Sequence, residues 1–328
     1  MTNWKLICLC AALVSPICSG ADVRFGDKTV IHFASVSEGQ KILTAKDDFV
    51  RHLSPFDRAS RLKTDKPVAE DEYLAFVGKN VTEWPTTERQ GVEAALTKIQ
   101  AGFGDWSLAF PAAIQFVRTT GAEEGNAAYT RGTAIMLPKA ELGKGPDYLT
   151  YVICHELFHV LSRQNPKLRD ELYGVIGFTR CDDLEFPANL APRKITNPDA
   201  PRNDHFIRLT IDGEKRPAIP ILFSRNETYD VTKGGDFFKY LEFQFLVVEL
   251  APGSQRPQVV SEKSGPKLVK PQAVPDFLEQ VGRNTEYIIH PEEILADNFA
   301  LLVLRKQEPK SPEVPEKMRA ILGRKTKS

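Results

Sequence analysis

The sequence predicts an α+β fold. Stretches with apolar residues at helical spacing lie near the middle and at the end of the chain, whereas short apolar runs bounded by turn residues lie before and between them. Hydrophobic residues make up 42% of the 328 residues, which is enough for the core of one large domain or two modest ones.

The net charge of the chain indicates which kinds of binding partner are not expected. The 43 basic and 43 acidic side chains cancel, and such a balance gives no support to nucleic-acid binding or to a polybasic membrane surface. After the N-terminus, no apolar run reaches the roughly 20 residues that a membrane-spanning helix needs. We therefore expect no nucleic-acid partner and no transmembrane span in the mature chain.

The first twenty residues have the pattern of a signal peptide. One lysine precedes a short apolar stretch, and the small residues Cys18, Ser19 and Gly20 follow it. We expect cleavage near Gly20 and a secreted or periplasmic protein. The alternative is an uncleaved N-terminal anchor.

The elements of the first half follow from apolar spacing. Residues 21–84 are expected to form strands and connectors, with EYLAFVG (72–78) among the strand candidates. Residues 86–103 repeat apolar positions at helical spacing and predict a helix. Two strands are expected next, over 112–121 and 127–138.

A further helix is predicted over residues 147–165. Asp147 is a plausible N-cap, and Pro166 cannot continue the helix. Apolar residues surround this segment on nearly all sides, which is typical of a buried helix.

The second half mixes loops, strands and two closing helices. The proline-rich stretch 251–275 is the best internal linker candidate, and 237–250 is compatible with strand or helix. The other expected elements are a proline-rich loop (183–204), a hairpin (205–211 with 217–224) and two helices (291–306 and 312–323).

The segment His155-Glu156-Leu157-Phe158-His159 carries the most specific chemistry. Residues four apart share one helical face, so the two histidines can bind one zinc ion. Glu156 is offset by about 100° and can take a proton from a zinc-activated water. The alternative is a half-exposed helix whose three polar residues face water.

Residues 152–161 as a whole resemble the extended signature of zinc peptidases. Uncharged residues flank the motif, and its last position is hydrophobic. Metzincins continue to a glycine and a third histidine, but Ser162 and Asn165 stand at those places here. That branch is therefore excluded.

A catalytic zinc usually has three protein ligands, so a third is needed. Pro291 suits the first turn of a helix in which Glu293 and Asp297 share a face. This segment resembles the second motif of gluzincins such as thermolysin. By that resemblance Glu293 is the third ligand and Asp297 orients a ligand histidine. Glu292 competes for the ligand role, but Ala296 gives it no partner four residues later.

The resemblance implies a zincin-like fold: an upper mixed sheet with a backing helix and an active-site helix, and a lower, mostly helical part. The implied parts are an N-terminal subdomain (21–165), a strand- and loop-rich insert (166–275) and a C-terminal helical part (276–328). The strand candidate 127–138 would then be the edge that pairs with extended substrate.

The roles of several other residues are left open by the sequence. Tyr229, Tyr287, His205 and His290 are candidate donors to a developing oxyanion. Cys154 and Cys181 are compatible with a disulfide and equally with two buried, small apolar side chains.

The leading interpretation is an exported zinc-dependent peptidase with one Zn²⁺ ion, acting on a peptide or protein substrate. The second is a protein of the same fold that binds zinc or a partner without cutting. The third is an exported binding module without metal.

Overall fold

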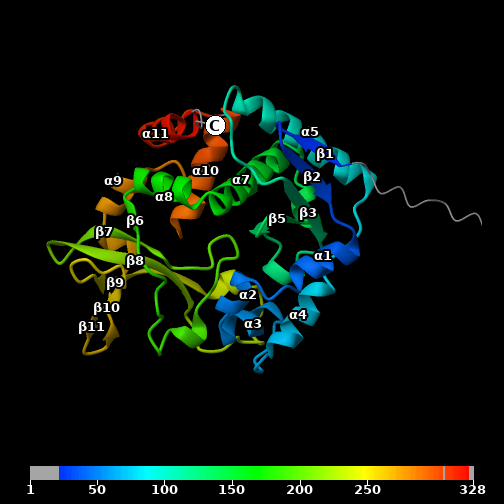
Figure 1. Cartoon of the computed structure of the whole chain (residues 1–328). Helices are drawn as coiled ribbons and strands as arrows, with labels where there is room; N and C mark the ends of the chain where they lie inside the picture. Colours follow the sequence, from blue (N-terminus) through cyan, green and yellow to red (C-terminus); the bar gives the residue numbers. More distant parts are fainter. Residues whose placement is uncertain (1–21, 306, 325–328) are drawn as a thin grey trace, which may run out of the picture.

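The computed structural model describes residues 22–305 and 307–324, so the predicted leader over residues 1–20 lies outside the described part. The described chain has an α+β fold with two main sheets, as expected. One sheet lies at the right of Figure 1 and the other at the lower left, with helices across the top. No helix in the described ranges is long and apolar enough to cross a membrane.

The first sheet is mixed. Its strands are β1 (Val23–Phe25), β2 (Thr29–Phe33), β3 (Ala113–Thr119), β4 (Tyr129–Arg131) and β5 (Ala134–Pro138). Their order is β1-β2-β3-β5-β4, with parallel pairs inside and antiparallel pairs outside. The prediction of one strand over 127–138 is wrong, because Gly132 (φ +60°) turns the chain into a β4–β5 hairpin. β4 is thereby left at the edge.

Four helices lie in the region predicted as strands and connectors. They are α1 (Val36–Leu43), α2 (Asp48–His52), α3 (Pro55–Arg61) and α4 (Glu70–Gly78). The strand prediction for 72–78 is wrong because acidic residues fill the first turn of α4, where they complement the helix dipole. Tyr73, Leu74 and Val77 are buried on one face of that helix.

Two long helices lie on the first sheet. α5 (Thr86–Phe103) packs along α7 (Pro146–Gln164), and the short α6 (Lys139–Leu142) precedes α7. The N-cap of α7 is Gly145, with φ +101°, and not Asp147. Pro146 takes the first helical position, where its missing N–H costs nothing, and this places Asp147 inside the first turn. α7 ends at Gln164, and Pro166 opens α8 (Pro166–Val175).

The second sheet is antiparallel throughout. Its strands are β6 (Phe178–Arg180), β7 (His205–Ile211), β8 (Glu214–Ser224), β9 (Leu241–Glu249), β10 (Gln258–Val259) and β13 (Leu268–Val269). The predicted hairpin is confirmed as β7 and β8. The ambiguous segment 237–250 forms a 3₁₀ turn, η3 (Phe237–Tyr240), followed by strand β9.

Short elements occupy the two proline-rich stretches. The first carries the 3₁₀ turn η2 (Ala191–Arg193). The second contains β10, β11 (Ser261–Glu262), β12 (Gly265–Pro266), β13 and η4 (Pro271–Ala273). Because β10 and β13 both pair with β9, this stretch is attached to the second sheet.

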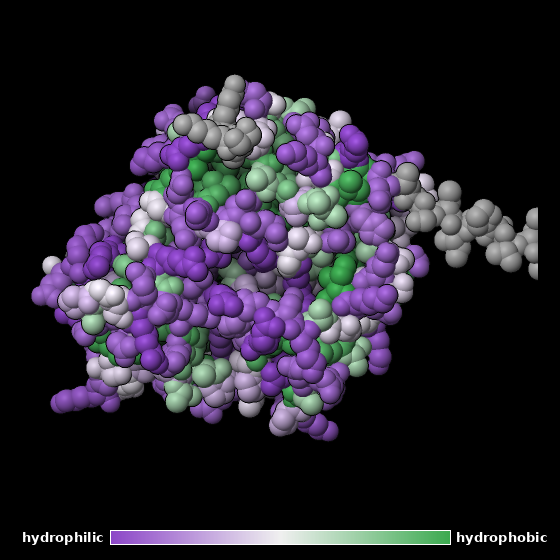
Figure 2. Space-filling model, viewed as in Figure 1, coloured by the Kyte–Doolittle hydropathy of each residue, from purple (hydrophilic) through white to green (hydrophobic). Residues whose placement is uncertain are grey.

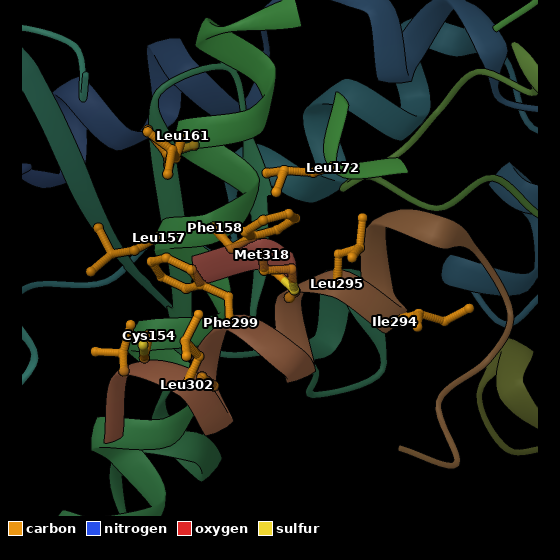
Figure 3. Close-up of a cluster of buried hydrophobic side chains, with 14 of the residues drawn as sticks. Cys154, Leu157, Phe158, Leu161, Leu172, Ile294, Leu295, Phe299, Leu302 and Met318 are labelled. Atoms are coloured by element: carbon orange, nitrogen blue, oxygen red, sulfur yellow. The ribbon is translucent and has the colours of Figure 1, made fainter. Parts of the chain in front are cut away.

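Three helices lie near the C-terminal end of the described chain. α10 (Pro291–Leu304) and α11 (Glu313–Leu322) are close to the predicted bounds, and α10 packs against α7. The short α9 (Asp276–Val281) was not predicted. Figure 3 shows apolar side chains of α7, α10 and α11 meeting in one cluster. The rings of Phe158 and Phe299 are 5.5 Å apart there. Phe158, Phe299 and Met318 are fully buried, so this apolar contact is internal. Hydrophilic residues cover most of the face seen in Figure 2.

The disulfide between Cys154 and Cys181, one of the two alternatives for these residues, is not formed. Cys154 and Cys181 are both buried free thiols in the described part of the chain. They belong to different hydrophobic clusters, Cys154 between α7 and α10 and Cys181 against the second sheet. The alternative of two small buried side chains is therefore the one observed.

Candidate metal centre

The two motif histidines lie side by side on α7. Their ring centroids are 4.7 Å apart, and the rings are nearly perpendicular. His159 is fully buried, and His155 is partly buried. The alternative of a half-exposed helix is wrong, because twelve residues of α7 are buried, Glu156 among them.

Glu293 of α10 faces both rings. Its Oε2 atom lies 3.0 Å from Nε2 of His155 and 3.6 Å from Nε2 of His159. These three side chains offer ligand atoms that all lie within 4.8 Å of one another. The structure therefore brings the three predicted zinc ligands together at one point.

A separate carboxylate holds the other nitrogen of each ring. Nδ1 of His155 lies 2.8 Å from Oδ1 of Asp297, and Nδ1 of His159 lies 3.1 Å from Oε1 of Glu292. Because an ionised carboxylate only accepts, each Nδ1 carries the proton. The Nε2 atoms are thus directed to the shared point, as in carboxylate–histidine–zinc sites. Asp297 thus contacts a predicted ligand histidine, and Glu292 makes a contact with His159 that sequence reasoning missed.

Other hydroxyl groups fix these two orienting carboxylates. Tyr151 donates to Asp297 at 2.5 Å, and Thr285 donates to its other oxygen. Tyr173 donates to Oε2 of Glu292 at 2.5 Å. Ser162 donates to Oε1 of Glu292, the oxygen that faces Nδ1 of His159. The carboxylates therefore keep one orientation, and so do the imidazoles that they hold.

Glu156 points toward the edge strand. Its Oε2 accepts a hydrogen bond of 2.8 Å from the hydroxyl of Thr130 on β4, and only 3% of the residue is exposed. Burial, followed by the charge of Asp199, raises the pKa of Glu156 to about 7. A carboxyl group in this range can both take and return a proton at neutral pH.

The imidazoles and carboxylates of the centre shift one another's pKa values. Although burial opposes a charged ring, hydrogen bonds with Asp297 and Glu293 raise the pKa of His155 well above its usual value. Burial would raise the pKa of Glu293, but the two imidazoles hold it at about 2. Nε2 of His159 is buried without a hydrogen-bond partner among the described residues. Two imidazole nitrogens and one carboxylate are a donor set that suits zinc.

A loop that sequence reasoning left unassigned also reaches the centre. Nδ2 of Asn197 donates to Oε1 of Glu293 at 2.5 Å. Asp199, with Glu156 and His159, forms a second group of potential ligands within 4.8 Å of one another. No local signal marks these residues, because Asn197 lies 96 positions before Glu293 in the chain.

Two of the four candidate oxyanion donors, Tyr287 and His290, lie close enough to Glu293 to interact with its charge. Although 40% of Tyr287 is exposed, desolvation of its hydroxyl, followed by the charges of Glu293, Asp199 and Glu156, raises the pKa of Tyr287 well above its usual value. Nδ1 of His290 accepts a hydrogen bond from the backbone N–H of Glu292. The other two are engaged elsewhere, Tyr229 with Gly235 and His205 with Asp204.

Comparisons of the chain with protein-family models, with curated proteins and with solved structures find no match in any of the three. The gluzincin resemblance therefore stays a resemblance of two short motifs.

Proposed function

We propose that this protein is an exported, zinc-dependent peptidase of the gluzincin kind, with a zincin-like arrangement of its first sheet, α5 and α7. The observation that supports it best is the position of the Glu293 carboxylate, which faces Nε2 of both His155 and His159. Export is inferred from the leader pattern of residues 1–20 alone.

Each side chain of the centre has one part in the proposed reaction. His155, His159 and Glu293 hold the zinc ion, which when bound would polarise the scissile carbonyl and acidify water. Glu156 takes the proton of the attacking water and passes it to the leaving amine. Thr130 keeps the Glu156 carboxylate in place for both transfers.

The substrate is a peptide or protein in an extended conformation. β4 lies at the edge of the first sheet beside Glu156, so its backbone groups can pair with such a chain. Tyr287 lines the same pocket as Asn197 and Asp199, and it is our candidate donor of a hydrogen bond to the developing oxyanion.

A second candidate function is zinc or partner binding without cleavage. Asn197 and Asp199 favour it, because they fill the space beside Glu293 and Glu156 in this conformation. Both candidate functions include the zinc centre, and only the first includes cleavage of a substrate.

Cleavage of casein by the purified protein tests the proposal. We expect cleavage that stops when a chelator is added and resumes with zinc. Glu156→Gln should keep one zinc per chain and lose turnover by at least about 100-fold, since a general base contributes that much. Full turnover in that variant would refute the proposed role of Glu156, and zinc binding without any cleavage would favour the second function.

A further inference from the structure

Residues 197–201, here named the strap, lie across the candidate zinc centre. Asn197 donates to the ligand Glu293, as described above. A carboxylate oxygen of Asp199 lies within 4.8 Å of ligand atoms of both Glu156 and His159. The strap therefore reaches the proposed ligands and the proposed base together.

Contacts outside the centre hold both ends of the strap. Before it, the backbone N–H of Thr196 donates to Asp57 at 3.1 Å, and its hydroxyl donates to the carbonyl of His52 at 2.9 Å. After it, Arg202 donates to both oxygens of Asp48, at 2.7 and 2.9 Å. Because α2 and α3 supply these anchors, the rest of the fold fixes where the strap lies.

The strap also occupies the edge that a substrate would need. The backbone N–H of Thr130 on β4 donates to Oδ1 of Asp199 at 2.6 Å. Arg163 donates to the carbonyls of Thr130 and Gly132 on one side, and to those of Pro198 and Asp199 on the other. An extended peptide pairs with an edge strand through these same backbone groups. Substrate and strap therefore exclude each other.

Asp199 approaches the centre on the side of His159. A carboxylate oxygen of Asp199 lies within 4.8 Å of a ligand atom of His159, which is shared with the group formed by His155 and Glu293. Nε2 of His159 is buried without a hydrogen-bond partner among the described residues. The Asp199 side chain accepts the Thr130 hydrogen bond, and within residues 22–305 and 307–324 it forms no ion pair within 4.0 Å. A zinc ion at Nε2 of His159 would therefore lie between this imidazole and a carboxylate that has room for a further partner.

We propose that Asp199 is a fourth protein ligand of the zinc ion and that the strap holds the centre in a closed, latent state. The proposal rests on the zinc centre of the proposed function. Zinc with four protein ligands is typical of structural sites, whereas catalytic sites keep one position open. Peptide substrate reaches β4 only after Asp199 and its neighbours have moved away.

Asp199→Asn tests the ligand assignment, with Asp182→Asn as a control that removes the same charge from an exposed position in the preceding loop. Zinc affinity is measured by competition with a chromogenic chelator, and coordination by the visible spectrum of the Co²⁺-substituted protein. We expect the affinity of Asp199→Asn to fall at least about 10-fold and its Co²⁺ spectrum to change. Unchanged affinity and spectrum, with zinc binding lost in His159→Ala, would overturn the assignment.

Hydrogen exchange of the strap amides gives a second readout that does not depend on activity. Zinc should slow exchange at Asp199 and Ala200 in the wild-type protein and in Asp182→Asn, but not in Asp199→Asn. Equal slowing in all three would overturn the proposal.

Latency has its own test. Asp199→Ala, saturated with zinc, should cleave casein several-fold faster than the wild-type protein, and an equal or slower rate would overturn the latent state. A protein that binds zinc through Asp199 but cleaves no casein in either form would keep the ligand assignment and refute the peptidase.

Discussion

At the scale of single residues, two neighbouring glutamates divide the work of the centre. The sequence favours Glu293 as the third ligand and gives Glu292 as its competitor. In the structure Glu293 faces the Nε2 atoms, whereas Glu292 holds Nδ1 of His159 and accepts hydrogen bonds from Ser162 and Tyr173. Adjacent helical positions point about 100° apart, so the two carboxylates reach opposite sides of the same imidazole.

This division predicts the behaviour of Glu292→Ala. The His159 ring loses the carboxylate that fixes its orientation, so zinc affinity should fall by about 10- to 100-fold while stoichiometric binding persists at high zinc. Glu286→Ala, an exposed carboxylate in the preceding loop, is the matched control. Chelator competition measures both, and equal affinities would show that Glu292 does not orient the ligand.

At the scale of elements, the contact between α7 and α10 brings the ligands together. The polar side of each helix forms the centre, and the apolar sides pack as Figure 3 shows. Phe299 lies near the middle of that contact, with ring centroids 5.5 Å from Phe158 and 6.1 Å from Phe103. The position of Glu293 relative to His155 therefore depends on apolar packing one turn away.

Phe299→Ala should lower the free energy of unfolding by about 3–5 kcal/mol, because a fully buried ring leaves a cavity. Phe238→Ala, at a site that is 43% exposed, should change it by less than about 1 kcal/mol. Urea denaturation of the metal-free protein measures both. Similar small losses in the two variants would contradict the packing that is described for α10.

At the scale of the whole molecule, one apolar core spans both sheets. The cluster that contains Phe158 and Phe299 also includes Ile31 of β2 and Phe245 of β9. The second sheet therefore packs into the same core as the first. The segment that follows this sheet in the chain can then place α10 against α7. This explains how Glu293 meets His155 from 138 positions away.

Local signals explain which features could be predicted. α7 and α10 follow from apolar periodicity and from Pro166 and Pro291, and the motif spacing gives His155 and His159 one face. The α4 helix was missed because a short apolar run suits helix and strand alike. The β4–β5 hairpin was missed because its turn at Gly132 was read as part of one strand. Asn197 and Asp199 were missed because they act only through contacts between segments that are distant in the sequence.

The most direct test of the central claim is the zinc content of the purified protein. The claim is that α7 and α10 meet around one divalent ion. Elemental analysis should give one zinc per chain for the wild-type protein. Glu293→Gln should lose most of it at limiting zinc while remaining folded by circular dichroism. No bound zinc in the wild-type protein, or full zinc content in Glu293→Gln, would contradict the claim.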